Sequence, residues 1–320
     1  MATGNGILMT DLVVGVDGGG SKTRLIVANA SGTHIADVTG PGSAMAPGRG
    51  DHSAGVIGDL LRQALSEAGI EGARPRALVA GVAGVGRPNE QRALTAALED
   101  LEIADEITVE GDGEIALTDA FGFGPGVILI SGTGSFAYGR GPSRTLARAG
   151  GWGPAFGDEG SGSWIGRKAL AIVASAADGR GPATALTGAI LTAAQVNEPQ
   201  ELIPWGIAST PRELAALAPV VFNAAVAGDV RANSLVGFAV EELVLHIRAL
   251  AIRLFVDERA AVPVAFSGGL LSKGSLLRKR LEQRLKSAVP GAQIRPGEII
   301  AARGAVRSAL ALAGMDAASL

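Results

Sequence analysis

Apolar and polar positions along the chain mark two similar hairpins about one domain apart. Residues 12–28 follow the pattern of an apolar strand, a sharp glycine-rich turn and a second strand. The same order returns at residues 127–138. This weak internal duplication predicts two domains of the same ancestry.

Between and after the hairpins, the pattern alternates and then becomes mainly helical. The first stretch predicts a helix over 54–68, a strand over 77–82, a helix over 89–98 and a strand over 107–109. Beyond Gly160 we expect helices over 164–177, 181–191, 211–227 and 230–256, a strand over 262–266 and a basic amphipathic helix over 275–287. The fold class is therefore α/β, with predicted domains at 11–122 and 123–303 and a last helix within 304–320.

Composition restricts the class of protein. The 320 residues suffice for two well-packed domains, and 47% are hydrophobic. The formal net charge of -3 and scattered basic residues argue against nucleic acid as a partner. The apolar windows are too short or too interrupted for a signal peptide or membrane span, so we expect a cytoplasmic protein without a membrane anchor.

Two residue types contribute little chemistry here. The chain has no cysteine, which excludes disulfides, cysteine-based zinc sites, iron–sulfur clusters and thiol nucleophiles. His34, His52 and His246 lie far apart without metal-ligand spacing, so we assign them no chemistry.

The first candidate motif is the turn of the first hairpin. Its sequence is Asp17-Gly18-Gly19-Gly20-Ser21-Lys22-Thr23. Consecutive glycines let the backbone approach an anion, the following side chains offer donors, and Asp17 at the strand end can hold Mg²⁺ through water. Taken alone, a plain tight hairpin is an equally good interpretation.

The second hairpin strengthens the phosphate interpretation. Its turn is Gly132-Thr133-Gly134-Ser135. Two such turns are expected if each domain contributes one side of the same triphosphate site. Neither turn fits the P-loop pattern or the dinucleotide fingerprint, which disfavours a Rossmann dehydrogenase.

Asp112 is the candidate catalytic base. It follows a short strand and is flanked by Gly111 and Gly113. A carboxylate at the carboxyl end of a strand lies where α/β sheets bind ligands, and it can accept a proton from a hydroxyl that attacks a phosphate. On local sequence alone, a turn or helix-capping role competes with this hypothesis.

Two further glycine-rich segments complete the set. Residues 150–164 hold six glycines, two tryptophans and two acids, a composition typical of a sugar-binding loop, although Trp164 alone could anchor a domain edge. Gly268 and Gly269 follow an apolar strand, where small residues would let adenosine lie against the backbone; alone this signal is weak.

This ordered set resembles the N-acetylglucosamine kinase and BadF/BadG/BcrA/BcrD ATPase-type branch of the sugar kinase, actin and Hsp70 superfamily, over residues 13–313. The resemblance implies two ribonuclease H-like domains with a cleft for sugar and ATP, Mg-ATP as phosphoryl donor, transfer to a sugar 6-hydroxyl, and domain closure. It also implies that Asp112 is the base, that the two hairpin turns bind phosphate, and that Gly268 and Gly269 bind adenosine. The sugar-binding residues carried over are Ser43, Thr133, Gly151, Trp152 and Asp158.

One departure bears on the substrate. Where the family usually has an asparagine, this chain has Met45, which cannot form amide hydrogen bonds to sugar hydroxyls. Either a neighbour such as Ser43 substitutes, or the substrate differs. N-acetylglucosamine leads, with glucosamine and N-acetylmuramic acid as alternatives.

Two other classes of protein compete with a kinase. An ATP-driven activator of the same branch would need cysteines for its iron–sulfur cluster, and a sugar-responsive repressor would need a helix-turn-helix segment before the first strand. A homodimer through the apolar helical faces between 211 and 256 is left open, with internal packing as its alternative.

Overall fold

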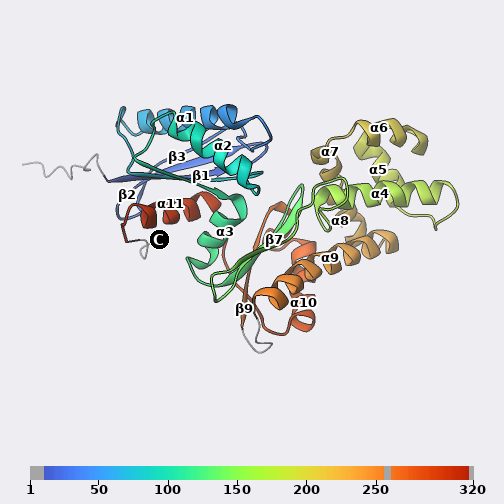
Figure 1. The fold of residues 1–320 in the computed structure, drawn as a ribbon. Coiled ribbons are helices and arrows are strands. Elements are labelled where there is room, and N and C mark those ends of the chain that lie inside the picture. Colours follow the sequence, from blue (N-terminus) through green and yellow to red (C-terminus); the bar gives the residue numbers. More distant parts are fainter. Residues whose placement is uncertain (1–10, 256–260, 317–320) are drawn as a thin grey trace, which may run out of the picture. The chain divides into compact units, whose positions relative to one another are not determined.

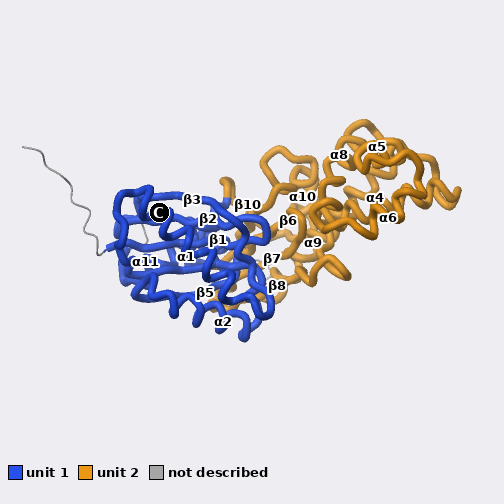
Figure 2. Tube along the Cα trace, turned by 90° about the horizontal axis from the view of Figure 1, so that it is seen from above, with its two compact units in different colours: residues 1–124, 299–320 blue, residues 125–298 orange. Residues whose placement is uncertain are grey.

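The computed structural model describes residues 11–255 and 261–316, and these form two compact units (Figures 1 and 2). Unit 1 comprises the described residues up to Gly124 together with those from Ile299 onward, and unit 2 comprises those from Pro125 to Glu298. Position 256 of the predicted helix over 230–256, and the end of the predicted last helix beyond 316, lie outside the described residues.

Unit 1 is a mixed five-stranded sheet with helices on both faces (Figure 1). Its elements are β1 (Leu12–Gly18), β2 (Thr23–Asn29), β3 (His34–Gly40), α1 (Gly50–Glu67), β4 (Ala77–Val82), α2 (Pro88–Glu99), β5 (Glu106–Gly111), α3 (Asp112–Phe121) and α11 (Ala301–Leu312). The strand order is β3-β2-β1-β4-β5; β1, β4 and β5 run parallel, and β2 is antiparallel to both its neighbours.

Alternation along β1 explains the two layers of unit 1. Val14 and Val16 pack with α1 and α2 on one face, whereas Val13 packs with α3 and α11 on the other. Because both faces are covered, β1 is almost continuously apolar, as the sequence pattern required.

Unit 2 repeats the sheet topology and adds a helical subdomain. Its elements are β6 (Gly126–Ser131), β7 (Ser135–Arg140), β8 (Leu146–Gly150), α4 (Gly162–Ala177), α5 (Leu186–Ala194), η1 (Pro199–Glu201), α6 (Leu202–Ala208), α7 (Pro211–Ala215), α8 (Ala218–Val226), α9 (Val230–Leu254), β9 (Val262–Ser267), η2 (Gly269–Leu271), α10 (Leu276–Ala288) and β10 (Ala292–Ile294). The order β10-β9-β6-β7-β8 mirrors the unit 1 order, with β6 in the place of β1.

The expected α/β fold of two domains is confirmed, with local differences. The helix expected over 211–227 is divided into α7 and α8, and Pro219, which has no N–H to donate, lies at the start of α8. The helix expected over 181–191 begins only at Leu186. Strands β3, β8 and β10, all at or near sheet edges, were not predicted.

No helix among the described residues is long and apolar enough to cross a membrane.

Candidate functional site

The first hairpin of unit 1 presents Asp17 at the carboxyl end of β1. The Gly19 N–H donates to the Lys22 carbonyl at 2.9 Å and closes the turn. Around Gly20 there is open space where a side chain would otherwise stand, and Ser21 and Lys22 are exposed. The turn therefore leaves backbone and side-chain donors accessible to an anion, as the phosphate interpretation requires.

Asp112 lies at the same edge of the sheet as Asp17. In the parallel register, Gly18 pairs with Val82, and Val82 pairs with Gly111, so β1, β4 and β5 end together and α3 begins at Asp112. Burial raises the pKa of the Asp17 carboxyl above its usual range, and the nearby Asp112 carboxylate raises it further, against the cations of Lys22 and Arg24. The structure thus brings together two carboxylates 95 positions apart in the chain.

Asp112 also has a local structural role. Its Oδ1 accepts a hydrogen bond from the Gly113 N–H at 3.0 Å in the first turn of α3. The N-cap residue of α3 is Gly111, without a side-chain cap, so Asp112 is the first residue of the helix and not its cap. The local hydrogen bond is compatible with a catalytic role, because a carboxylate has further acceptor sites.

Thr23 and Ser43 lie beneath the turn instead of on its surface. Both side chains are fully buried, and the Thr23 hydroxyl donates to the Ser43 hydroxyl at 2.8 Å. Ala44 N–H also donates to the Gly19 carbonyl at 3.1 Å, so this segment braces the hairpin from below. In this arrangement the Ser43 side chain supports the site and has no surface available to a sugar.

Met45 belongs to the core of unit 1. It is only 7% exposed, its N–H donates to the Ala83 carbonyl at 2.8 Å, and its side chain packs among the apolar residues beneath α1. The side chain at this position is therefore a packing element rather than a sugar ligand.

In unit 2, the second hairpin is joined to the loop before α4. Ser131 Oγ donates to the Gly160 carbonyl at 3.0 Å, and Ser135 Oγ donates to the Glu159 carbonyl at 2.7 Å. The Gly162 N–H donates to the Gly132 carbonyl at 2.8 Å. These bonds hold the predicted phosphate turn and the predicted sugar loop together as one surface.

Asp158 is held in an uncommon backbone conformation at this junction. Its φ is +59°, in the left-handed region, where Asp is tolerated better than most residues. Burial raises the pKa of its carboxyl, although the N–H groups of Gly153 and Ser135 donate to it. Such geometry fixes a carboxylate beside Gly134 of the turn, where a Cβ would stand 3.0 Å from Asp158 Oδ2.

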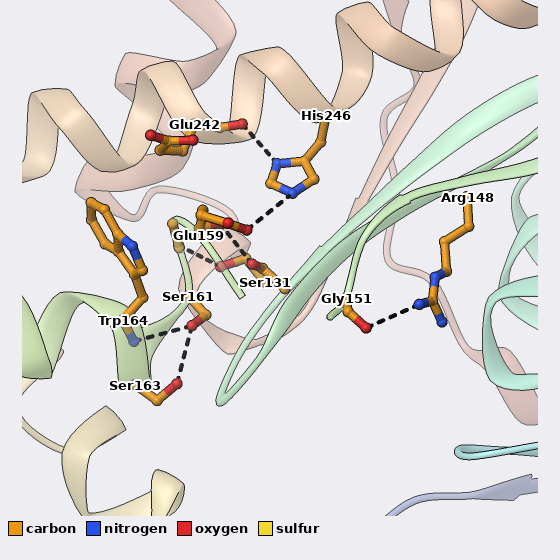
Figure 3. Close-up of polar contacts among 11 residues, drawn as sticks. Ser131, Arg148, Gly151, Glu159, Ser161, Ser163, Trp164, Glu242 and His246 are labelled. Atoms are coloured by element: carbon orange, nitrogen blue, oxygen red, sulfur yellow. Dashed lines mark hydrogen bonds and ion pairs between the residues drawn. The ribbon is translucent and has the colours of Figure 1, made fainter. Parts of the chain in front are cut away.

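Trp152 and Gly151 lie at the accessible end of the same loop. Trp152 is 68% exposed, which leaves its ring available to stack on a sugar face. The Gly151 carbonyl accepts a hydrogen bond from an Arg148 guanidinium N–H at 3.0 Å (Figure 3). Trp164, by contrast, is half-buried in α4, and the side chain of Ser161 accepts from its N–H.

The turn after β9 packs directly on the second hairpin. Gly268 has φ +91°, and a Cβ there would stand 2.3 Å from the Ser131 carbonyl oxygen, so no other residue fits without movement. Gly269 follows with open space beside it. The predicted adenosine turn and the predicted phosphate turn are thus adjacent within unit 2.

Sequence reasoning missed His246. This α9 side chain is 7% exposed and lies against Gly150, where a Cβ would come within 2.1 Å of Nε2. Its Nδ1 is 2.7 Å from the Glu242 carbonyl oxygen, and Nε2 is 3.8 Å from the Glu159 carboxylate (Figure 3). No local pattern could reveal this, because His246 and its loop partners are far apart in sequence.

The residues present suit ATP and Mg²⁺. No group of three or more metal-ligating side chains occurs among the described residues. Magnesium ions are usually held by one or two carboxylates together with substrate phosphates. Asp17 and Asp112 in unit 1 offer such carboxylates, and the two glycine-rich turns offer the donors for phosphate.

Comparison with known proteins decides the family. The sequence model of the BadF/BadG/BcrA/BcrD ATPase family matches residues 14–309. The chain belongs to this family. The resemblance found in the motifs is confirmed, and membership of an ATPase family makes ATP its nucleotide.

Relatives of this family member include sugar kinases. It is 31% identical to an N-acetylmuramic acid/N-acetylglucosamine kinase of Clostridium acetobutylicum, over 88% of this chain and 92% of that protein. It is 28% identical to an N-acetyl-D-glucosamine kinase of Dictyostelium discoideum, over 89% and 93%. A Chromobacterium violaceum structure provisionally assigned as an N-acetylglucosamine kinase is 32% identical, with a TM-score of 0.77 over 93% of this chain and 98% of that one.

Proposed function

We propose that this protein is an ATP-dependent kinase that phosphorylates the 6-hydroxyl of an amino sugar, with N-acetylglucosamine as the leading substrate. The observation that carries the proposal is the pair of carboxylates, Asp17 and Asp112, at one sheet edge beside a glycine-rich turn. The names of the relatives indicate the substrate class.

In this mechanism, bound ATP supplies the phosphoryl group, with Mg²⁺ as its counter-ion. The Asp112 carboxylate orients the sugar hydroxyl and accepts its proton as the hydroxyl oxygen bonds to the γ-phosphorus of ATP. The bond from that phosphorus to the bridging oxygen breaks, and ADP leaves. Asp17 would hold the cation, and the turn of residues 17–23 would bind phosphate through its N–H groups and the Lys22 ammonium.

Unit 2 supplies the remaining contacts in this proposal. The turn of residues 132–135 binds phosphate, and Gly268 and Gly269 receive the adenosine. Thr133, Gly151, Trp152 and Asp158 contact the sugar. The bonds between that turn and the sugar loop support this assignment, because they let one rigid surface hold both ligands.

The deciding experiment measures ADP release with Mg-ATP across amino sugars and glucose. The panel is N-acetylglucosamine, glucosamine, N-acetylmuramic acid, N-acetylmannosamine and glucose, with 6-deoxy-N-acetylglucosamine as a substrate lacking the accepting hydroxyl. We expect turnover on an amino sugar, none on the 6-deoxy compound, and a loss of about 100-fold or more in Asp112→Asn with ATP binding retained.

A matched control is Asp100→Asn, which changes an exposed carboxylate at the end of α2 and should leave turnover unchanged. Full turnover in Asp112→Asn would remove this residue from the mechanism. ATP hydrolysis that no sugar stimulates would instead favour an ATPase-type activator of the same family.

A further inference from the structure

The strand that leads into the proposed sugar loop carries an exposed arginine. Arg148 lies on β8, and one of its guanidinium N–H groups donates to the Gly151 carbonyl at 3.0 Å (Figure 3). A Cβ on Gly151 would stand 3.6 Å from Arg148 Cζ, so the guanidinium lies against this glycine. Next in the chain is Trp152, whose exposed ring is available to stack on a sugar. A cation therefore stands beside the proposed sugar site.

Alternation along β8 explains why this side chain points away from the core. Ala147 and Ala149 pack on the apolar core of unit 2, and Arg148, between them, lies on the other face of the strand. At the end of β8, Gly150 and Gly151 have φ values of +72° and +70°, in the left-handed region that glycine adopts freely. The chain therefore turns sharply here, and the Gly151 carbonyl lies within reach of Arg148.

The charge of Arg148 is available to a ligand. A guanidinium has five N–H donors in a planar fork, and the bond to Gly151 uses one of them. No Asp or Glu of the described residues forms an ion pair with Arg148, whereas Arg278 of the same unit pairs with Glu282 at 2.7 Å. The remaining donors can therefore bind an anion from solution.

The acid nearest to this end of the sugar loop in sequence is engaged elsewhere. The Asp158 carboxylate accepts hydrogen bonds from the N–H groups of Gly153 and Ser135, and it lies near the cation of Arg167. It leaves the guanidinium of Arg148 without an internal counter-ion.

The bonds of Arg148 favour an anion on the sugar over a phosphate of ATP. Ser135 of the proposed phosphate turn donates to the Glu159 carbonyl, late in the loop sequence. Arg148 instead bonds to the start of the loop, one residue before Trp152. A guanidinium binds a carboxylate through two parallel N–H···O bonds, a geometry that the ammonium of lysine cannot reproduce.

We propose that Arg148 is a specificity-determining residue that binds the carboxylate of an acidic amino sugar. In such a sugar an ether-linked acid, for example the lactyl group of N-acetylmuramic acid, extends from the ring. With the ring stacked on Trp152, the carboxylate accepts two hydrogen bonds from the Arg148 guanidinium. The inference rests on the proposed function of the sugar loop and adds the charge of the preferred substrate.

The first test is equilibrium binding of N-acetylmuramic acid and of its methyl ester, measured by isothermal titration calorimetry without nucleotide. The two compounds share one ring and nearly the same bulk, and only the acid is charged. We expect the wild type to bind the acid about tenfold more tightly, Arg148→Gln to bind both equally, and Arg148→Lys to keep part of the preference. Loss of the bond to Gly151 weakens both compounds alike, so it cancels from the ratio.

The matched control is Arg144→Gln. Arg144 is an exposed arginine in the turn between β7 and β8, and its loss changes the net charge equally. This variant should keep the wild-type preference; an equal loss there would indicate general electrostatic attraction and contradict the proposal. A wild type that does not bind the acid, or binds acid and ester equally, overturns the proposal, as does an unchanged preference in Arg148→Gln.

The second test is turnover of the same two compounds with Mg-ATP. We expect Arg148→Gln to lower the acid-to-ester ratio of kcat/KM about tenfold. A rise in the KM for ATP with an unchanged ratio would place Arg148 at the phosphates and reject its role toward the sugar. Turnover of N-acetylglucosamine by a wild type without preference for the acid would keep the proposed function and reject this inference. Preferential binding of the acid without turnover of any sugar would do the reverse.

Discussion

At the scale of single residues, a charged carboxylate in the candidate site lowers the stability of the fold. Asp17 is a partly buried carboxylate whose pKa is raised by burial and then by Asp112. Asp37 has the opposite environment, because the Arg24 guanidinium donates to it and lowers its pKa. Both side chains belong to unit 1, yet only Asp17 is expected to destabilise the fold when it is charged.

Replacing Asp17 should therefore stabilise the protein. Because folding raises its pKa above the ordinary 3.8, stability falls as pH rises from that value through the folded pKa. At neutral pH we expect Asp17→Asn to raise Tm by about a few degrees, with the gain shrinking as pH is lowered toward 3.8. Thermal melts across pH test this.

Asp37→Asn serves as the comparison of opposite sign. Because folding lowers the pKa of Asp37, its charge stabilises the fold above the ordinary pKa, and this stabilisation is lost as pH falls through the folded pKa. At neutral pH the free energy of unfolding of Asp37→Asn should therefore be lower than that of the wild type, by less than about 1 kcal/mol. If Asp17→Asn lowers Tm as well, the idea that its charge opposes folding is wrong.

His246 is a positioning residue in our interpretation. It packs on Gly150 and lies near Glu159, at the two ends of the loop proposed to hold the sugar. We expect His246→Ala to raise the KM for the sugar roughly tenfold, or about 1.4 kcal/mol, with little change in the KM for ATP. Steady-state kinetics measure this split.

The control for His246 is His52→Ala, which removes an exposed histidine from α1. It should leave both KM values unchanged. Equal rises of both KM values in His246→Ala would indicate a general structural defect rather than a role in placing the sugar loop.

At the scale of elements, the contact between α3 and α11 controls the packing of unit 1. A Cβ on Gly304 would stand 1.9 Å from the Ile115 carbonyl oxygen and 2.7 Å from the Asp119 nitrogen. The two helices therefore touch backbone to backbone. The buried Asp119 carboxylate secures the same crossing, because it accepts hydrogen bonds from Arg303 and from the Ile300 N–H.

Gly304→Ala should strongly destabilise the fold, because backbone atoms cannot yield as a flexible side chain can. We expect a loss of roughly 2–4 kcal/mol in the free energy of unfolding, measured by urea denaturation. Gly188→Ala is the matched control, since this α5 glycine has open space around its Cβ position and should gain about 0.5–1 kcal/mol. Equal stability of the two variants would contradict the close crossing.

At the scale of the whole molecule, unit 1 is built from two segments of the chain, and its last helix, α11, comes after the whole of unit 2. One layer of the unit 1 core joins Val13 and Ile26 with Ile115 and Val306. The whole of unit 2 is inserted between these segments. The first hairpin can therefore form locally, whereas the layer beneath it depends on contacts that span nearly the entire sequence.

Much of the fold could be predicted because its signals are local. Strands β1, β4, β6 and β9 are buried apolar runs, and α11 has clear amphipathic spacing. The edge strand β3 escaped prediction because its residues are largely exposed and carry little apolar signal. The short β10 has only three residues, too few for a period to appear.

The sequence by itself determined the family and the residue types available for binding and catalysis. Glycine-rich turns, strand-end carboxylates and the absence of cysteine are all local properties of the chain. Only the tertiary structure decided which residues share a surface. The parallel register through β4 brings Asp17 beside Asp112, and core packing takes the Ser43 and Met45 side chains away from the surface. The contact of His246 with Gly150 likewise depends on the packing of α9 against β8, which no local pattern encodes.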